Sequence, residues 1–212
     1  GGGQVTMELA RLGHKVVGMD QSENMINTSN LLREKFSIAI KKRTYFQIGS
    51  LTKNKLEGQK FDLCLAMGVI GYQPNDDILF RFSKKVLKSK GVFAVSCRNK
   101  LFNMQSLSFR TLNDIKKKKS ASLIKEIIDL YSEIPVEISN KIIKNFKNTS
   151  KKIKYFKKVN TNEKLSPAHK KSGRRDYKPF YEPKQHTPKT VSLSAKKNGF
   201  NIKSFHGVHP HL

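Results

Sequence analysis

The chain has 212 residues, of which 37% are hydrophobic, and its 42 Lys and Arg residues outnumber 16 Asp and Glu residues to give a formal net charge of +26. This length suffices for one buried core with an appended subdomain. The sequence has no run of 18 apolar residues, which argues against a membrane-spanning helix, and we expect a soluble, cytoplasmic protein.

A glycine run opens the sequence and leads into a helix, a strand that ends in an acid, and a second helix. Gly1 to Gly3 precede a helical pattern at about 4–13, a buried strand follows at 15–20, and Asp20 stands at its end. In a doubly wound sheet, such glycines let the backbone approach a nucleoside, and the acid accepts hydrogen bonds from ribose hydroxyls. The alternative is a glycine-rich turn and a solvated acid that bind nothing.

Two other glycine motifs do not fit this segment. A dinucleotide site requires G-x-G-x-x-G/A, and counting from Gly1 places Thr6 at the third glycine position. The phosphate-binding pattern G-x-x-x-x-G-K-[ST] is absent from the sequence.

Alternating strands and helices continue to about residue 99. We expect a long helix at 23–41, a strand at 44–48 and a strand at 61–67 that is covered on both faces. A helix that begins near Pro74 should end before a Lys90-Gly91 turn, and a further strand should span 92–97. This order predicts an α/β fold with a parallel sheet.

Two cysteines fall within these predicted strands. We interpret Cys64 and Cys97 as buried thiols in a reducing compartment. The alternative is a nucleophile for cytosine methylation, which usually stands in a Pro-Cys context that neither cysteine has.

The pattern changes after residue 100. Apolar periodicity predicts helices around 123–131 and 138–146, and a Pro- and Gly-containing loop should cover 160–184. Thr187 and Pro188 should then begin a helix that ends at Gly199, before a strand at 200–205. We therefore divide the chain into a core at 1–99, a basic helical insertion at 100–184 and a C-terminal core segment at 185–212.

Positive charge is concentrated within the insertion. Residues 138–178 hold fourteen Lys and Arg residues against Glu163 and Asp176. Such a segment could follow a nucleic-acid backbone. It could equally be the solvated face of a subdomain, or meet an anionic substrate or membrane surface.

Three segments together resemble the class I S-adenosylmethionine-dependent methyltransferases: ELARLGHKVVGMDQSENMI, KFDLCLAMGVIGY and VLKSKGVFAVSCRN. They are similar to that family's first helix through acidic loop, its fourth strand and its fifth strand. The resemblance implies a doubly wound, mostly parallel, Rossmann-like sheet that lacks its first strand here, with a helical insertion after strand five that covers the active site and selects the substrate.

The resemblance also implies site residues. Those for the cofactor S-adenosylmethionine are Gly1, Gly3, Asp20, Ser22, Met25, Ser50, Leu51, Met67 and Gly68. Ser22 and Met25 equally fit helix capping and core packing, and Ser50 stands where many members carry an Asp that bonds the adenine amine. Position beside the cleft suggests Ile70, Tyr72, Arg98 and Asn99 for the substrate.

The implied activity is methyl transfer to an oxygen or nitrogen of a small or medium polar metabolite. The motif [DNS]-P-P-[YFW] is absent after the fourth strand, which argues against adenine amines as acceptors. His186 is a candidate base, or a residue that only packs at a helix start. The alternatives are an RNA methyltransferase that uses 138–178, with nucleic acid as partner, and an inactive basic binding module.

Two further expectations concern the chain ends. His206, His209 and His211 are interpreted as loop residues without a metal, and the oligomeric state is left open. The strand that precedes the glycine motif in the family is missing, and a chain that starts at Gly1 should lose backbone partners on both neighbouring strands. We therefore expect the 212 residues alone to be aggregated or molten, and an upstream strand to restore folding and cofactor binding.

Overall fold

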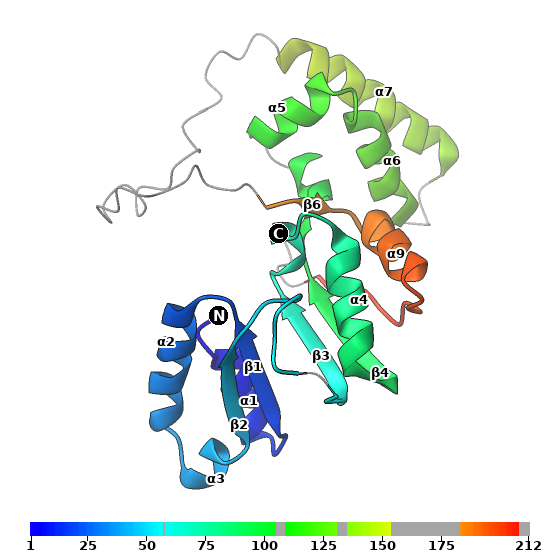
Figure 1. Cartoon of the computed structure of the whole chain (residues 1–212). Coiled ribbons are helices and arrows are strands. Elements are labelled where there is room, and N and C mark those ends of the chain that lie inside the picture. Colours follow the sequence, from blue (N-terminus) through cyan, green and yellow to red (C-terminus); the bar gives the residue numbers. More distant parts are fainter. Residues whose placement is uncertain (57, 105–108, 131–134, 154–182, 208–212) are drawn as a thin grey trace, which may run out of the picture. The chain divides into compact units, whose positions relative to one another are not determined.

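The fold is described from a computed structural model of residues 1–56, 58–104, 109–130, 135–153 and 183–207, with 109 and 149–153 described by their backbone alone. The chain forms two compact units. Unit 1 comprises residues 1–65 and 75–94, and unit 2 comprises residues 66–74 together with the chain from Val95 onward. Figure 1 shows the elements of each unit. Our division into three segments differs from these units and stays a prediction.

Unit 1 begins with a helix, a strand and two further helices that lead to a second strand. These elements are α1 (Gln4–Arg11), β1 (Val16–Asp20), α2 (Glu23–Glu34), α3 (Ile38–Lys41) and β2 (Thr44–Ile48). Strands β1 and β2 pair in parallel, with Val16 opposite Thr44 and Asp20 opposite Ile48. Met7, Ile26 and Phe46 form a buried core cluster. The predicted α/β order and the parallel pairing are confirmed here.

The prediction of one long helix at 23–41 was wrong, because the structure has two helices with a break between them. Helix α2 ends at Glu34, and Ser37 adopts an extended conformation (φ −61°, ψ 156°) before α3 begins. Leu32, Phe36 and Ile40 still pack against the core cluster from both sides of the break. The apolar residues therefore keep their spacing toward the core although the helix is interrupted, and the sequence pattern does not reveal this interruption.

The second half of unit 1 contains β3 (Phe61–Met67), α4 (Asp76–Val86) and β4 (Leu87–Ser96), and the last residues of β3 and β4 belong to unit 2. Asn75 caps α4 by accepting a hydrogen bond from the Asp77 N–H at 2.9 Å. Strand β4 pairs with β3 and packs on α4 through Phe93 and Phe80, whose ring centroids lie 5.6 Å apart.

Two details of this region differ from the expectation. No turn forms at Lys90-Gly91, because β4 starts directly at Leu87 and Gly91 has no positive φ that would reverse the chain. Strand β3 is not covered on both faces: Leu63 is 42% exposed and Met67 is 53% exposed. Within the described residues, β4 is the strand that pairs with β3.

Unit 2 contains a short pair of strands and a group of helices. They are η1 (Ile70–Tyr72), β5 (Arg98–Asn99), η2 (Lys100–Met104), α5 (Phe109–Lys116), α6 (Ser120–Leu130), α7 (Val136–Ile153), β6 (Gln185–His186) and α9 (Pro188–Lys197). Helices α6 and α7 lie where the periodicity predicted them. A capping box between Thr187 and Thr190 starts α9, and Gly199 follows it with φ 77°.

The strand expected at 200–205 is absent from the described part of the chain. Residues 200–207 have no regular structure, and Phe205 is 54% exposed. A strand needs hydrogen-bonding partners, and no described strand pairs with this segment. The described strands instead form three two-stranded sheets, β1–β2, β3–β4 and β5–β6.

No helix in the described ranges is long and apolar enough to cross a membrane.

Candidate functional site

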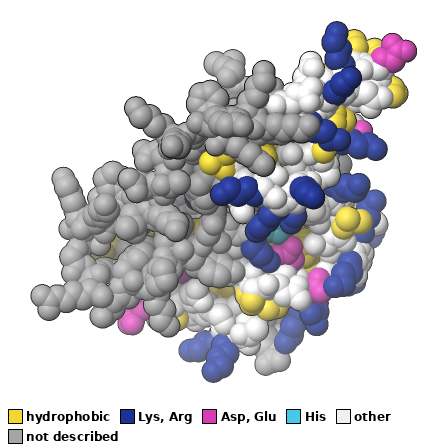
Figure 2. Space-filling model, turned by 90° about the horizontal axis from the view of Figure 1, so that it is seen from above, with side chains coloured by type: hydrophobic (Ala, Val, Ile, Leu, Met, Phe, Trp, Pro, Cys, Tyr) yellow, Lys and Arg dark blue, Asp and Glu magenta, His cyan; other side chains and the backbone are white. Residues whose placement is uncertain are grey.

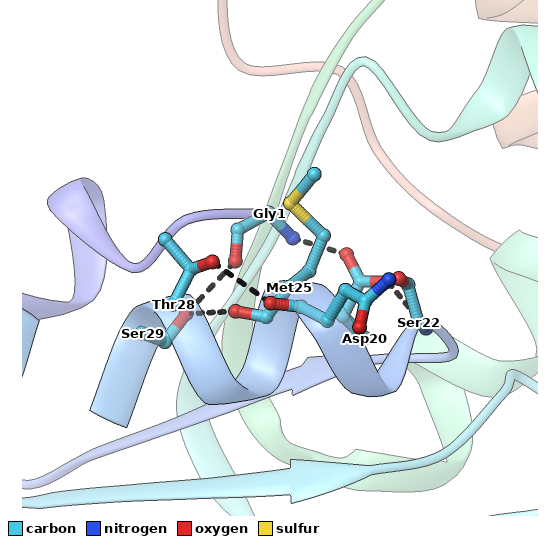
Figure 3. Close-up of polar contacts among 7 residues, drawn as sticks. Gly1, Asp20, Ser22, Met25, Thr28 and Ser29 are labelled. Carbon is cyan, nitrogen blue, oxygen red and sulfur yellow. Dashed lines mark hydrogen bonds and ion pairs between the residues drawn. The ribbon is translucent and has the colours of Figure 1, made fainter. Parts of the chain in front are cut away.

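The nucleoside-side candidates lie at the carboxyl end of β1 in unit 1. The Asp20 carboxylate contacts the amino group of Gly1 and accepts a hydrogen bond from the Ser22 N–H at 2.8 Å (Figure 3). The structure therefore brings Gly1, Asp20 and Ser22 together. Their assignment to the cofactor stays a prediction.

Hydrogen bonds to Asp20 favour its ionised form. Burial alone would raise the pKa of Asp20, but the hydrogen bonds from the Gly1 amino group and from the Ser22 N–H outweigh it and lower the pKa from its ordinary value. Asp20 is therefore a charged acceptor at neutral pH, which suits recognition of hydroxyl donors.

The glycine turn has little space for side chains. Gly3 has φ 85°, and a Cβ at this position would lie 3.0 Å from Ser29 Cβ and 3.1 Å from Phe46 Cζ. Positive φ and a close approach both require glycine here. Gly3 thus lets α1 begin directly beneath the turn.

Ser29 is a residue that the sequence analysis missed. Its side chain is fully buried, and its Oγ lies 2.9 Å from the carbonyl oxygens of both Gly1 and Met25. This hydroxyl ties α2 to the glycine turn (Figure 3). Its position on the buried side of α2, between Ile26 and Leu32, was the only available signal.

Met25 and the β2 loop are the other unit 1 candidates. Met25 is 44% exposed, so it does not face the core as we expected and remains available to a ligand. The Ser50 hydroxyl accepts a hydrogen bond from the Lys53 N–H at 3.0 Å, and the Ser50 N–H donates to the Lys53 carbonyl at 2.7 Å. Ser50 therefore shapes its own loop, and Leu51 follows it in that loop, partly buried.

The remaining candidates all belong to unit 2. Met67 and Tyr72 are exposed, whereas Ile70 is fully buried. Gly68 (φ 71°) donates its N–H to Ser96 Oγ at 2.8 Å, which ties the loop after β3 to the end of β4. Gly71 accepts a hydrogen bond from the Lys184 N–H at 2.8 Å.

Gly71 brings the segment before β6 against this loop. A Cβ on Gly71 would lie 2.9 Å from the Lys184 carbonyl oxygen, so a side chain there would push the two segments apart. Strand β6 then pairs in parallel with β5, with Gln185 opposite Arg98 and His186 opposite Asn99. The structure thus assembles the loop after β3, Arg98, Asn99 and His186 within one unit.

His186 and Asn99 differ in exposure. His186 is 5% exposed, and Asn99 is half-buried and accepts a hydrogen bond from the Leu101 N–H at 3.0 Å. Arg98 is exposed. The roles of these three residues stay predictions.

The structure describes both cysteines and one of the three C-terminal histidines. Cys64 is partly buried, but Cys97 is exposed, because β4 ends at Ser96. The expectation of a buried Cys97 was therefore wrong. His206 contacts Ser204 Oγ at 2.9 Å, whereas His209 and His211 lie outside the described residues. Within the described part of the chain, no group of three or more His, Cys, Asp or Glu residues could hold a metal.

Sequence comparisons place the first part of the chain among known proteins. A family model described as a methyltransferase domain matches residues 1–95. The ubiquinone biosynthesis O-methyltransferase of Bartonella quintana (strain Toulouse) is 32% identical over 108 residues, which cover 51% of this chain and 42% of that protein. The enzyme of the same name from Pelagibacter ubique (strain HTCC1062) is 29% identical over 102 residues, which cover 47% and 40%. The chain thus spans about two fifths of the length of these curated relatives.

Two solved structures are also similar. The CcbJ methyltransferase from Streptomyces caelestis has a TM-score of 0.44 at 22% identity, over 51% of this chain and 43% of that one. PKMT2 from Rickettsia typhi has a TM-score of 0.48 at 16% identity, over 93% and 36%. Residues 1–95 are thus similar to a methyltransferase domain, in agreement with the sequence resemblance to the class I S-adenosylmethionine-dependent methyltransferases.

Proposed function

We propose that the protein is an S-adenosylmethionine-dependent O-methyltransferase that acts on a hydroxyl of a small or medium polar metabolite. The observation that carries this proposal is the position of the Asp20 carboxylate at the carboxyl end of β1, where it accepts a hydrogen bond from the Ser22 N–H, in a methyltransferase domain. The curated relatives are O-methyltransferases by name, which favours oxygen over nitrogen as the acceptor atom.

The residues of unit 1 fit the nucleoside part of S-adenosylmethionine. Asp20 is a hydrogen-bond acceptor at the end of β1, and ribose hydroxyls of the cofactor would donate to its carboxylate. The tight turn at Gly3 leaves the backbone, and not a side chain, facing the ligand. The exposed thioether side chain of Met25 stands on the first turn of α2 and could cover the adenine.

The residues of unit 2 fit the acceptor side. S-adenosylmethionine supplies an electrophilic methyl group, so the chain mainly has to align the acceptor oxygen and remove its proton. Arg98 and Tyr72 are exposed groups that can bind a polar acceptor. His186 is the group that we propose takes the hydroxyl proton, since a histidine can accept a proton near neutral pH.

Calorimetric titration with S-adenosylhomocysteine tests the cofactor site. Asp20→Asn should weaken binding at least tenfold, because a hydrogen bond to a charged group contributes about 1.5–3 kcal/mol. Asp62→Asn is the matched control, since Asp62 is an exposed acid of the same unit that pairs with Lys88 at 2.8 Å. Equal affinity of the Asp20→Asn protein and the unsubstituted protein would contradict the assignment.

A transfer assay with radiolabelled S-adenosylmethionine tests the acceptor class. Catechols and hydroxybenzoates form one arm, aliphatic amines a second, and transfer RNA a third. We expect label in the hydroxylated acceptors. Label in RNA alone would favour the RNA methyltransferase. Figure 2 shows Lys and Arg side chains on the visible described surface.

A further inference from the structure

A buried polar chain in unit 2 links the start of the insertion to strand β6. Asn103 and Asp114 are each 4% exposed. Asn103 Nδ2 donates to Asp114 Oδ2 at 2.7 Å and to Gln185 Oε1 at 2.9 Å, and Gln185 Nε2 donates back to Asn103 Oδ1 at 3.1 Å. Lys100 Nζ lies 3.1 Å from Asp114 Oδ1. The two amides are 82 residues apart in the sequence.

The Lys100–Asp114 ion pair determines the direction of every hydrogen bond in this series of four side chains. A carboxylate paired with a lysine can only accept, so Asn103 must turn its amide NH2 toward Asp114. The amide oxygen of Asn103 then faces Gln185 and requires the NH2 of Gln185 as its donor. The Lys100–Asp114 pair thereby sets the orientation of the Gln185 side chain through Asn103.

Gln185 is one of the two residues of β6. Successive side chains of a strand point to opposite faces, so a Gln185 that is held in the polar chain directs His186 to the other face, beside its register partner Asn99. A two-residue pairing contributes few backbone hydrogen bonds of its own. The hydrogen bonds among these side chains therefore add to the few contacts that fix the register of β5 and β6.

We propose that Lys100, Asp114, Asn103 and Gln185 form a positioning chain that holds His186 beside Asn99 on the acceptor side of the site. This inference rests on the proposed function for its catalytic meaning. Its structural content, the register of β5 and β6, can be measured independently.

The test uses reversal of polarity in the full chain. Gln185→Glu keeps the shape of the side chain but places a carboxylate against the Asn103 oxygen, and we expect amide hydrogen exchange at His186 to rise about tenfold or more, while β1 and β2 amides stay unchanged. In the double variant Asp114→Asn/Gln185→Glu, Asn103 can turn round and serve both new neighbours. Exchange at His186 should then fall most of the way back. The control Gln59→Glu, at an exposed glutamine, should change neither region.

Activity and exchange separate the possible failures. With a catechol that the enzyme methylates, kcat should fall in Gln185→Glu and recover in the double variant, whereas KM for S-adenosylmethionine should stay unchanged. Unchanged exchange in the single variant, strictly additive effects in the double variant, or an unchanged kcat would each overturn the positioning role. If Gln185→Glu does not fold, Gln185→Met gives the same local measurement. Normal exchange results without any methyl transfer by the unsubstituted protein would refute the proposed function and leave the strand register standing.

Discussion

The Ser29 hydroxyl lies 2.9 Å from the carbonyl oxygen of Gly1, although the two residues are separated by 28 positions in the sequence. The same hydroxyl lies 2.9 Å from the Met25 carbonyl within its own helix. A fully buried serine therefore joins the helix after the acidic loop to the backbone of the glycine turn. This link holds the glycine turn, which we propose forms the nucleoside side of the site.

Ser29→Ala should loosen the glycine turn and weaken binding of S-adenosylhomocysteine. We expect a loss of about 1 kcal/mol in the free energy of unfolding, which is typical of one buried hydrogen bond, and a several-fold weaker affinity. Calorimetry and urea unfolding measure the two effects. Thr28→Ala is the control, because the Thr28 hydroxyl donates to the Asn24 carbonyl of its own helix, at 2.8 Å. Equal affinities of the two variants would contradict a role for Ser29 in the turn.

Gly3→Ala should destabilise unit 1 more than Gly13→Ala does. Both glycines have positive φ, 85° and 99°, which costs an alanine about 1–2 kcal/mol. At Gly13 nothing lies within 4 Å of an added Cβ, whereas at Gly3 the methyl group meets Ser29 and Phe46. Denaturant unfolding of both variants separates the cost of the methyl contact at Gly3 from the cost of positive φ, which both variants share. A smaller loss of stability at Gly3 than at Gly13 would show that the turn is not tightly packed.

The sequence predicted features that depend on near neighbours and failed where distant residues decide. Gly13 and Gly199 each follow the end of a helix, where a glycine favours positive φ, and both have positive φ in the structure. Gly91 suggested a turn by its residue type, but strand pairing keeps it extended within β4. The reciprocal Asn103–Gln185 amide pair has no local signal at all, since neither residue differs from a solvated amide in its own segment. Ser29 had only a weak signal, its position on the buried side of α2, and its partner Gly1 lies 28 positions away in the sequence.

Gln47→Met should stabilise unit 1. Gln47 is 6% exposed in β2, and among the described residues neither its Nε2 nor its Oε1 has a hydrogen-bond partner. A buried polar group without a partner costs about 1–3 kcal/mol, and methionine fills a similar volume without that cost. We expect the free energy of unfolding to rise by about 1 kcal/mol in urea titrations.

The control for Gln47 is Gln59→Met, at an exposed position of the same unit, which should change stability little. A destabilised Gln47→Met protein would indicate that the Gln47 amide has a hydrogen-bond partner, such as a water molecule.

Cys64 and Cys97 should react with iodoacetamide at very different rates. Burial raises the pKa of the Cys64 thiol above its ordinary value, and the hydrogen bond of its Sγ with Ser83 Oγ at 3.7 Å offsets this only in part. Because the thiolate is the nucleophile, a raised pKa leaves less of it at pH 8. Cys97 is exposed, just past the end of β4.

The measurement follows alkylation by mass spectrometry in Cys97→Ser and Cys64→Ser proteins between pH 7 and pH 10. The Cys97→Ser protein should react slowly at pH 8 and gain rate only as the pH rises through the elevated pKa of Cys64, whereas the Cys64→Ser protein should react readily at pH 8. Full denaturation should make the two rates equal, because it removes the burial that separates them. Fast alkylation of Cys64 in the folded protein at pH 8 would contradict its partial burial in β3, where its Sγ contacts Ser83 of α4.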